Sequence, residues 1–454
     1  MALATDRPTI FAPSTAAGRA AVAVLRISGP RAGAALTALT GRKLPPPRLA
    51  ARARLFDPAT GQPLDDGLVL WFPAPRSFTG EDVAELHLHG GRAVLAGVMA
   101  ALSRQPGLRV AEAGEFTRRA FDAGKLDLAE VEGLSDLIAA ETEAQRRQAL
   151  RQLAGELGRL TEAWRERLLR ALAHAEAEID FPDEDLPGGL IAALRPALGD
   201  LAGEIRRHLD DERRGERLRD GVSIAIIGPP NAGKSSLLNR LARREAAIVS
   251  AIAGTTRDVI EVQLDLGGYP VIVADTAGLR DLHGRHSPQD ELEREGMRRA
   301  LARAEAADLK ILVLDATALS VDAAVGELAD ANTLVVANKI DAAAGPPITL
   351  AGHVTHALSA KTGRGLETFL DVLQHEVAAR LAMADTAAPV ITRARHREAL
   401  ADCVAALDRA LAGTAPELIA EDLRLAARAL GRITGRVGVE DVLDVIFREF
   451  CIGK

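Results

Sequence analysis

Residues 228–235 read Gly-Pro-Pro-Asn-Ala-Gly-Lys-Ser, directly after the apolar run 222–227 and directly before the helical pattern 236–241. This order of strand, glycine-rich loop and helix is the context of a phosphate-binding P-loop. The glycines let backbone N–H groups wrap a nucleotide's phosphates, Lys234 reaches the β and γ oxygens, and Ser235 offers a hydroxyl to Mg²⁺. The stretch therefore predicts an α/β nucleotide-binding domain.

Three later stretches distinguish GTP from ATP. Residues 275–278 (Asp-Thr-Ala-Gly) end a second apolar run and predict a carboxylate near Mg²⁺ and a glycine N–H at the γ-phosphate. Residues 338–341 (Asn-Lys-Ile-Asp) end a third run, and Asp341 can accept two hydrogen bonds from guanine that adenine does not offer. Residues 359–361 (Ser-Ala-Lys) can close over the base. Their order and spacing predict GTP.

The residues expected to hydrolyse GTP depart from the Ras pattern. Leu279 stands where Ras-like proteins carry a water-orienting glutamine, so catalysis must be completed from elsewhere. Segment 250–258 has the position of a first switch, with Thr256 placed to close on Mg²⁺. The Asn231 amide could coordinate a monovalent cation beside the phosphates, with carbonyls and a hydroxyl from that segment; alternatively it only shapes the loop. The predicted GTP contacts are Asn231, Ala232, Gly233, Lys234, Ser235, Ser236, Ser250, Ala251, Ile252, Ala253, Gly254, Thr255, Thr256, Asp275, Thr276, Ala277, Gly278, Asn338, Lys339, Asp341, Ser359, Ala360 and Lys361.

The whole chain has the composition of an ordinary water-soluble protein. Its 454 residues leave room for several domains, and 56 basic against 63 acidic residues give a net charge of −7. No global basic field is present, so any contact with RNA must be local or shared with a partner. Two cysteines, Cys403 and Cys451, indicate a reducing compartment without disulfides. No apolar run is long enough for a membrane span, and we expect a cytoplasmic protein.

Hydrophobic periodicity divides the chain into four segments. Residues 1–123 mix short strands with turns and one helix, residues 124–218 are helical, residues 219–380 form the P-loop domain, and residues 381–454 are helical again. Each helical flank carries an apolar stripe that needs a partner, so the simplest account is one discontinuous helical domain interrupted by a GTPase domain.

Several details of these segments are specific enough to test. The stripe Leu128, Val131, Leu134 and Ile138 predicts one core-facing helix, and a stripe from Leu150 through Trp164 to Leu168 predicts a second. The charged pattern that runs to about Asp220 predicts a further helix with a solvated face. Gly267-Gly268 between two apolar runs predicts a tight hairpin.

With these residues in view, the chain resembles the MnmE (TrmE) family of tRNA modification GTPases over essentially its whole length. Besides the guanine-nucleotide set and the doubled Thr255-Thr256, the resemblance rests on residues 25–29 (Leu-Arg-Ile-Ser-Gly), 77–82 (Ser-Phe-Thr-Gly-Glu-Asp), 114–116 (Gly-Glu-Phe), 179–184 (Ile-Asp-Phe-Pro-Asp-Glu) and 450–454 (Phe-Cys-Ile-Gly-Lys). It implies a multidomain fold: an α/β folate-binding N-terminal domain that dimerises, a discontinuous all-α domain, and an inserted Ras-like α/β P-loop GTPase domain.

The resemblance also implies partners and chemistry. Such proteins form homodimers and work with the flavoprotein MnmG. Together they build an aminomethyl or carboxymethylaminomethyl group at carbon 5 of the wobble uridine of certain tRNAs, with 5-formyl- or a related tetrahydrofolate as one-carbon donor. GTP and Mg²⁺, the latter held by Ser235 and Thr256, and K⁺ are the other implied ligands.

Particular residues inherit roles from the family. K⁺ would lie at Asn231, Ser250, Ile252 and Thr255. Glu293 would join Lys234 as a catalytic residue by orienting water, although segment 282–289 is longer than in typical members and Glu291 and Glu295 compete for that register. The folate site would comprise Arg26, Glu85, Lys125 and Lys454, because a pterin offers donors to a carboxylate and a folate tail attracts cations.

Some alternatives stay open at this stage. Cys451 could add to carbon 6 of uracil as a thiolate, or it could be a packed thiol whose segment places Lys454. A second hypothesis for the whole chain is a ribosome-assembly GTPase with a potassium-type P-loop, which would carry a basic RNA-binding appendage. A third is a regulatory scaffold that binds folate only as a ligand.

Overall fold

The computed structural model describes residues 7–16, 18–180, 190–243, 247–248, 261–275, 305–318, 329–343, 350, 352–381, 391–437, 443, 446–447, 450 and 453. The chain divides into two compact units. The first comprises Met1–Ser135, Gln152–Arg170 and Ala427–Lys454, and the second comprises Asp136–Arg151 and Ala171–Ala426. Among the described residues, no helix is both long and apolar enough to cross a membrane.

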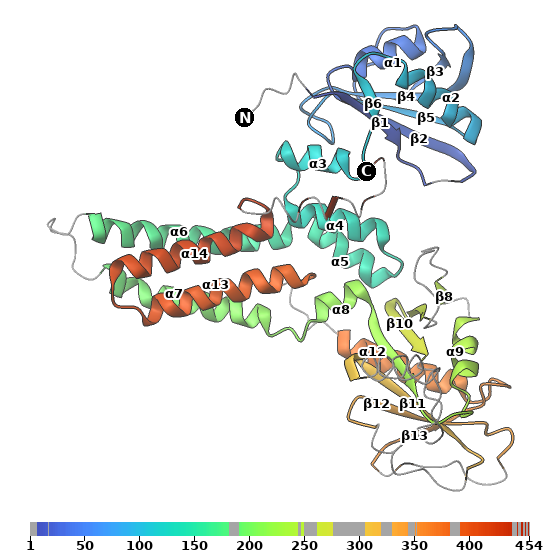
Figure 1. Ribbon diagram of the computed structural model, residues 1–454, viewed down its shortest axis with the longest axis vertical. Helices are drawn as coiled ribbons and strands as arrows, with labels where there is room; N and C mark the ends of the chain where they lie inside the picture. Colours follow the sequence, from blue (N-terminus) through green and yellow to red (C-terminus); the bar gives the residue numbers. More distant parts are fainter. Residues whose placement is uncertain are drawn as a thin grey trace, which may run out of the picture. The chain divides into compact units, whose positions relative to one another are not determined.

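A six-stranded sheet with three helices forms the N-terminal part of the first unit (Figure 1). Its elements are β1 (Thr9–Pro13), β2 (Ala20–Ser28), α1 (Ala32–Thr40), β3 (Ala51–Phe56), β4 (Pro63–Phe72), β5 (Val83–Gly90), α2 (Arg92–Ser103), β6 (Leu108–Val110) and α3 (Glu115–Asp122). The strand order is β3-β4-β5-β2-β1-β6. Neighbouring strands are antiparallel except β1 and β6, which are parallel. The expected α/β character of this segment is confirmed, but the expectation of a single helix was wrong, because α1 and α3 are helices as well as α2.

The two faces of this sheet have different coverings. Buried residues of α1 and α2 form one cluster with Leu25 and Leu86. Side chains alternate between the faces along a strand, so Arg26 and Glu85 lie on the opposite face. Phe116 of α3 belongs to a separate cluster on that second face. A charged pair and an aromatic helix therefore share one side of the sheet.

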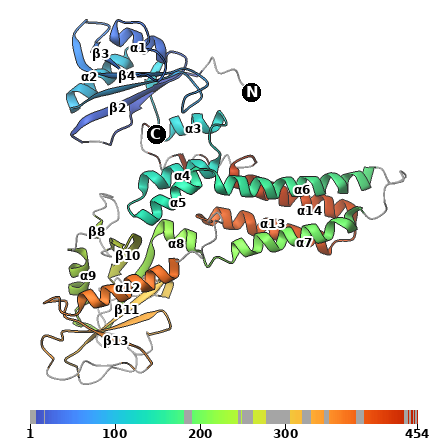
Figure 2. The ribbon, with the colours of Figure 1, turned by 180° about the vertical axis from the view of Figure 1, so that it is seen from behind.

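Helices follow, and they lie side by side in both ribbon views: α6 beside α14, and α7 beside α13 (Figures 1 and 2). The helices are α4 (Leu128–Ala139), α5 (Glu143–Leu153), α6 (Glu156–Asp180), α7 (Leu190–Leu209), α8 (Arg214–Asp220), α13 (Ala394–Ala412) and α14 (Pro416–Thr434). Helices α13 and α14 follow the P-loop segment in the sequence but pack against helices that precede it. This confirms the predicted discontinuous helical domain.

The apolar stripes are less regular than their periodicity predicted. The second stripe does not lie on one helix, because α5 ends at Leu153 and Gly155 adopts a left-handed φ of +76° before α6 begins. Leu150 and Ile138, both expected in the core, are 40% and 44% exposed. The core prediction was wrong at these two positions. The prediction of one continuous second helix was wrong because a glycine in a left-handed conformation breaks a helix that periodicity alone would continue.

The predicted charged helix is also interrupted. Helix α7 ends at Leu209, and α8 begins only at Arg214 after two left-handed residues, Glu212 and Arg213. Its charges are not all solvated, because Glu216 is only 8% exposed and is paired with arginines. Burying a carboxylate requires such partners, and sequence periodicity does not reveal them.

The P-loop segment of the second unit is a seven-stranded sheet. Its elements are β7 (Val222–Ile227), α9 (Lys234–Ala242), β8 (Ala247–Ile248), β9 (Glu261–Leu266), β10 (Tyr269–Asp275), β11 (Leu309–Asp315), β12 (Thr333–Asn338), β13 (Thr355–Ala357) and α12 (Leu366–Leu381). The order is β13-β12-β11-β7-β10-β9-β8. Neighbouring strands from β13 to β10 are parallel, and β9 is antiparallel to both of its neighbours, β10 and β8. Gly267 and Gly268 have φ of +63° and +91°, which confirms the predicted hairpin.

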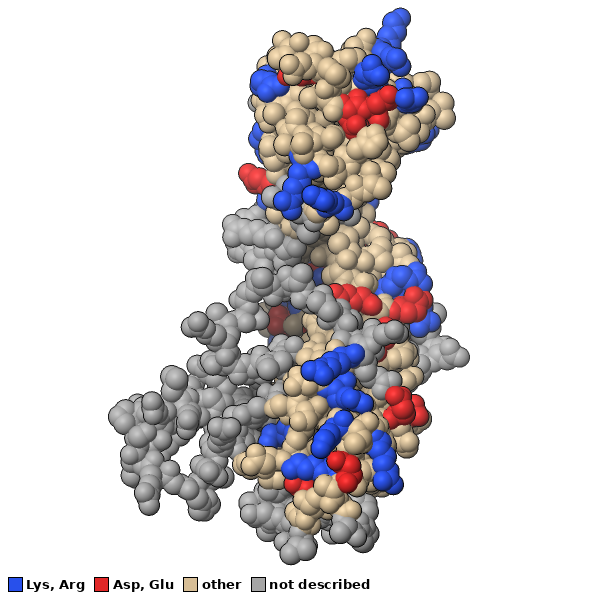
Figure 3. All heavy atoms as spheres, turned by 90° about the vertical axis from the view of Figure 1, so that its right-hand side faces the viewer, with Lys and Arg blue, Asp and Glu red and all other residues tan. Residues whose placement is uncertain are grey.

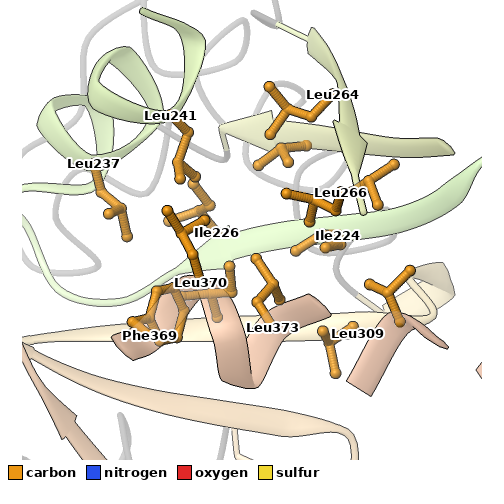
Figure 4. Packing of buried hydrophobic residues seen from close by; sticks show 14 of the residues in the cluster. Ile224, Ile226, Leu237, Leu241, Leu264, Leu266, Leu309, Phe369, Leu370 and Leu373 are labelled. Carbon is orange, nitrogen blue, oxygen red and sulfur yellow. The ribbon is translucent and has the colours of Figure 1, made fainter. Parts of the chain in front are cut away.

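One face of this sheet is closed by α9 and α12. Leu237 and Leu241 of α9 and Phe369 and Leu373 of α12 surround the β7 side chains, among them Ile226, in one buried cluster (Figure 4). The cluster holds α9 in place at its N-terminal end, where the P-loop enters the helix.

Charge on the described surface is mixed. On the face that Figure 3 shows, lysine and arginine side chains gather in places with acidic side chains among them, and much of the upper part is uncharged. This face carries no uniform basic field, in keeping with the net charge of −7.

Candidate functional site

The P-loop leaves β7 through backbone conformations that only small residues adopt easily. Gly228 has φ of +137°, and a Cβ there would lie 2.3 Å from the carbonyl oxygen of Val313. Gly233 has φ of +94°, and a Cβ there would lie 2.2 Å from the side-chain nitrogen of Asn338. Both contacts are far inside van der Waals distance, so a side chain at either position would displace the loop. The glycines thus set the loop's path at the head of α9.

Lys234 is the first residue of α9 and is 8% exposed. Its Nζ donates hydrogen bonds of 2.9 Å to the carbonyls of Gly228 and Pro229, so the ammonium group lies across the loop. Ser235 and Ser236 follow it in the first turn and are exposed. The N–H groups of a helix N-terminus and the helix dipole favour phosphate binding there. The arrangement matches what a nucleotide's phosphates require.

Asn338, at the end of β12, connects three predicted contact segments. This side chain is 2% exposed. Its Nδ2 donates to the carbonyl of Ala232 at 2.8 Å, and its Oδ1 accepts the N–H of Ala360 at 2.9 Å. One amide therefore holds together the P-loop and the two segments that were predicted to contact guanine.

Asp341 projects from the loop after β12. The hydroxyl of Ser359 donates to its Oδ1 at 2.6 Å, and this hydrogen bond lowers the pKa of Asp341 below its ordinary value of 3.8. An ionised carboxylate is the form that accepts hydrogen bonds from guanine. Lys339 has a left-handed φ of +67°, and its Nζ lies 2.6 Å from Oδ2 of Asp315, a partner that sequence reasoning missed.

The remaining predicted nucleotide, metal and catalytic residues lie largely outside the described residues. Asp275 is the last residue of β10, where the prediction put it. Asn231 is exposed with a left-handed φ of +61°. Across the described ranges, no three His, Cys, Asp or Glu side chains gather in a way that could hold a metal ion. The residues outside the description are Ser250, Ala251, Ile252, Ala253, Gly254, Thr255, Thr256, Thr276, Ala277, Gly278, Leu279, Glu291, Glu293 and Glu295.

A second polar site occupies the open face of the N-terminal sheet. Arg26 and Glu85 are direct cross-strand partners on β2 and β5, and Nε and Nη2 of the arginine lie 3.0 and 2.9 Å from Oε1 of Glu85. The guanidinium carbon also lies 5.2 and 5.7 Å from the ring centres of Phe78 and Phe116. His87 Nε2 is 3.8 Å from Oε2 of the same glutamate and was not predicted. A flat ring with polar edges suits this combination of aromatic and charged groups.

One further predicted folate residue, Lys125, lies beside the loop of Phe78, and the described end of the C-terminal segment reaches β1. Lys125 is exposed, and Gly80 of the loop that carries Phe78 packs beside its side chain: a Cβ on Gly80 would lie 3.5 Å from Cε of Lys125. Gly453 accepts a 2.9 Å hydrogen bond from the Ser14 hydroxyl, directly after β1. Lys454 and Cys451 lie outside the described residues. The C-terminal segment thus reaches the sheet that holds Arg26.

A buried network behind this site was missed by sequence reasoning. The hydroxyl of Ser28 lies 2.7 Å from Thr79 Oγ1 and donates to Glu81 at 2.7 Å. Arg119, 4% exposed, binds Glu81 and Glu115, each at 2.9 Å. Burial alone would raise the pKa of Glu115, but two arginine side chains and a backbone N–H hold that pKa below its ordinary value. The network fixes the 77–82 loop to β2 and α3.

Comparisons with known proteins agree with this arrangement. A model of the MnmE helical domain matches residues 128–451, and a model described as GTP-binding protein TrmE N-terminus matches residues 9–125. The tRNA modification GTPase MnmE of Parvibaculum lavamentivorans is 64% identical over 452 residues, covering 98% of this chain and 100% of that protein. The protein of the same name from Paramagnetospirillum magneticum is 60% identical, covering 98% and 99%. The solved G domain of the T. maritima FeoB iron transporter is 25% identical over 35% of this chain and 98% of its own, with a TM-score of 0.25 that is too low to support an argument.

Proposed function

The chain belongs to the MnmE family of tRNA modification GTPases, and from this membership we propose that GTP hydrolysis by this protein drives modification of the wobble uridine of tRNAs. The group installed at carbon 5 is an aminomethyl or carboxymethylaminomethyl group, built jointly with an MnmG-type flavoprotein. The hydrolysis energy serves conformational change, because GTP itself does no chemistry on uracil.

Guanine recognition is the best-supported part of the proposal. The observation that carries it is Asn338, which joins the P-loop and the loop of Ala360 at 2.8 and 2.9 Å. With those loops fixed, Asp341 accepts the two guanine donors while Ser359 holds its carboxylate. The loops that bind the base and the loop that binds the phosphates are then joined through the hydrogen bonds of Asn338.

Phosphate binding uses the helix end and the buried lysine. When GTP binds, the Lys234 ammonium group stops donating to the loop carbonyls and donates to the β- and γ-phosphate oxygens instead. The first turn of α9 supplies backbone N–H groups to the phosphates. Ser235 and Thr256 hold Mg²⁺, which neutralises phosphate charge when bound. Asn231, Ser250, Ile252 and Thr255 hold K⁺, the counterpart of an arginine finger. Glu293 orients the attacking water, a role that Leu279 cannot perform.

The N-terminal site binds the one-carbon donor in this proposal. Glu85 accepts hydrogen bonds from the pterin, Arg26 orients that glutamate, and Lys125 and Lys454 attract the negatively charged tail. Bound tetrahydrofolate supplies the one-carbon unit. Cys451 either adds to uracil as a thiolate or only helps to place Lys454, and the test below separates the two.

The same family membership supports further proposals about assembly. Residues 1–123 mediate a homodimer, and the segments 124–218, 219–380 and 381–454 keep the division predicted from the sequence. The protein works in the cytoplasm with tRNA and the flavoprotein, without a membrane partner. Full-length identity to MnmE proteins favours this function over ribosome assembly and over a folate-binding scaffold.

The decisive experiment measures GTP hydrolysis in matched KCl and NaCl for the wild type and Glu293→Ala. We expect acceleration only by K⁺, and a loss on the order of 10²-fold in the variant. Equal rates in both salts would reject the K⁺ site at Asn231. A fully active variant would move the water-orienting role to Glu291 or Glu295.

The tRNA part of the proposal has its own test. Wobble nucleosides are measured in a deletion strain complemented with the wild type, Cys451→Ser or Lys454→Ala, with isotope-labelled formyl-tetrahydrofolate. Label is expected in the wild-type nucleoside and not with Lys454→Ala. Retained label with Cys451→Ser would exclude the nucleophile role, and unlabelled, unmodified uridine with the wild type would reject the function.

A further inference from the structure

The β9–β10 hairpin joins the two segments expected to respond to GTP. Strand β9 begins at Glu261, just after the predicted first switch 250–258, and β10 ends at Asp275, which opens the predicted Asp-x-x-Gly element. Each strand spans about 20 Å at roughly 3.3 Å per residue. The turn, Gly267-Gly268, is therefore the end of the hairpin remote from both switches.

That turn is held by a helix of the helical domain. The backbone N–H of Ala144, in the first turn of α5, donates to the carbonyl of Gly268 at 3.1 Å. Ala144 is only 6% exposed and belongs to the buried cluster that contains Leu264 and Leu266 of the hairpin. Helix α5 is thus part of the GTPase core at its beginning, although the helical family model covers it.

The turn fits this position closely. The carboxylate of Asp265 accepts the Gly268 N–H at 2.6 Å, which fixes the turn internally. A Cβ on Gly267 would lie 2.2 Å from Nε2 of Gln374 on α12, so the turn is also confined from the side. A tightly confined turn passes on a displacement of its strands and does not absorb it.

The start of α5 is fixed in turn to the helix that enters the sheet. Thr142 and Gln145 cap each other, with Thr142 N–H donating to Gln145 Oε1 at 3.1 Å and the Gln145 N–H donating to the Thr142 hydroxyl at 3.3 Å. The same Gln145 donates through Nε2 to the carbonyl of Arg219 on α8 at 2.9 Å. Asp136, at the end of α4, binds Arg219 and Arg393 through one oxygen at 3.1 and 2.7 Å.

Those two arginines flank the GTPase segment in the sequence. Arg219 comes just before β7, and Arg393 just before α13. One carboxylate therefore clamps both chain crossings, and Asp136, Gln145 and Arg219 also line a cavity of about 120 Å³. Unlike these crossings, the hairpin turn belongs to the element that connects the two predicted switch segments.

Helix α5 runs from the second compact unit into the first along the chain. Its last residues, Gln152 and Leu153, belong to the first compact unit. Gln152 Nε2 donates to the carbonyl of Ala129 on α4 at 3.1 Å, and a Cβ on Gly133 would lie 2.5 Å from the Leu153 nitrogen. Helix α4 in turn packs through Val131 against residues of the C-terminal segment.

We propose that the Gly268–Ala144 contact transmits the conformational difference between the GTP-bound and GDP-bound states from the GTPase domain to α5. Helix α5 then transmits this difference to the unit that contains the predicted folate site. Ala144 is thus a positioning residue for the coupled reaction. The inference rests on the proposed GTPase function, but it requires neither the K⁺ site nor the identity of the one-carbon donor.

Hydrogen exchange on the full-length wild type tests the contact directly. The protein is compared with saturating GDP and with a non-hydrolysable GTP analogue, and nucleotide binding is verified separately with a fluorescent analogue. We expect exchange of the Ala144 and Gly268 amides to differ about fivefold or more between the states. Equal exchange with both nucleotides bound overturns the inference and leaves the GTPase intact; failure to bind nucleotide overturns both.

A pair of variants on α5 tests the consequence. Ala144→Leu overpacks the contact, whereas Arg147→Leu adds the same side chain at an exposed position of the same helix. We expect both variants to hydrolyse GTP within about twofold of the wild type. Ala144→Leu should reduce wobble modification about tenfold, and Arg147→Leu should not. Wild-type modification by Ala144→Leu overturns the inference, and if that variant does not fold, the exchange experiment decides alone.

Discussion

The side-chain nitrogen of Asn338 lies 2.8 Å from the carbonyl oxygen of Ala232, although the two residues are 106 positions apart. The other amide atom receives the N–H of Ala360. One buried side chain thus holds the P-loop and the loop of Ala360 together, which we propose fixes the separation of the phosphate and guanine contacts.

Asn338→Ala should weaken GTP binding about tenfold or more. It leaves the Ala232 carbonyl and the Ala360 N–H without partners, at about 1–3 kcal/mol for each buried group. Isothermal titration with GTP measures the effect. Asn239→Ala, at an exposed position on α9, is the control and should bind normally. Unchanged affinity in Asn338→Ala would refute the aligning role.

The Asp341→Asn variant should bind xanthosine triphosphate more tightly than GTP, the reverse of the wild type. The asparagine amide donates to the carbonyl that xanthine carries in place of guanine's amine, and each lost charge-assisted hydrogen bond to guanine costs about 1.5–3 kcal/mol. Ser359 can still donate to Oδ1, so the loop keeps its position. Competition between the two nucleotides measures the change, and a variant that still prefers GTP would contradict it.

The pKa of Asp341 makes a prediction for the wild type. Because the Ser359 hydrogen bond lowers this pKa below 3.8, the carboxylate stays ionised above that pH. The preference for GTP over inosine triphosphate, which lacks the guanine amine that Asp341 accepts, should therefore be constant down to acidic pH for as long as the protein is folded. Competition binding at several pH values checks this, and a preference that fades near neutral pH would be inconsistent with an ionised Asp341.

Arg119→Met should destabilise the N-terminal unit. The substitution keeps most of the aliphatic side chain but leaves Glu81 without its cation. Glu115 still has Arg109 as a partner, so only one carboxylate loses its ion pair, and we expect a cost of about 2–3 kcal/mol. Denaturant unfolding measures it. Arg109→Met, at a 42% exposed side chain, should cost less than about 1 kcal/mol. Equal losses in the two variants would show that burial of the network is unimportant.

Gly453→Ala should uncouple modification from hydrolysis. A Cβ there would lie 1.9 Å from the carbonyl oxygen of Pro13, and φ is +102°, so the segment that carries Lys454 must move. Misplacement of a reacting or binding group costs on the order of 10- to 100-fold in modification, with GTP hydrolysis unchanged. Gly203→Ala, where an added Cβ meets nothing within 4 Å, is the control. Full modification by Gly453→Ala would exclude a precise role for the tail.

Cys403 should be inert in the folded protein. Burial raises the pKa of this thiol from 9.0 to about 12, so almost no thiolate forms at ordinary pH. The neutral thiol favours folding below pH 9.0, and this contribution is lost as the pH rises from 9.0 toward 12. In a Cys451→Ser background, a thiol reagent at pH 8 should label Cys403 only after denaturant is added. Rapid native labelling would contradict its burial.

The sequence by itself determined the P-loop, the guanine loops and the interrupted helical domain. Those features depend on local rules: glycines where the backbone must turn left-handed, a lysine and serine at a helix start, and apolar periodicity that needs a partner. The Gly267-Gly268 hairpin followed in the same way. Each of these can be read within a few neighbouring residues.

The tertiary structure alone decided the contacts that link such elements. The buried Arg119 network and the docking of Ala144 on Gly268 join residues far apart in sequence. The breaks at Gly155 and at Glu212-Arg213 interrupt helices that apolar periodicity alone would continue. Periodicity does not distinguish a charge that faces solvent from one buried beside a distant partner, because the desolvation cost and its compensation depend on what packs around it. Hence the sequence predicted the groups that we propose bind GTP, and the fold decided which of the described ones are held together.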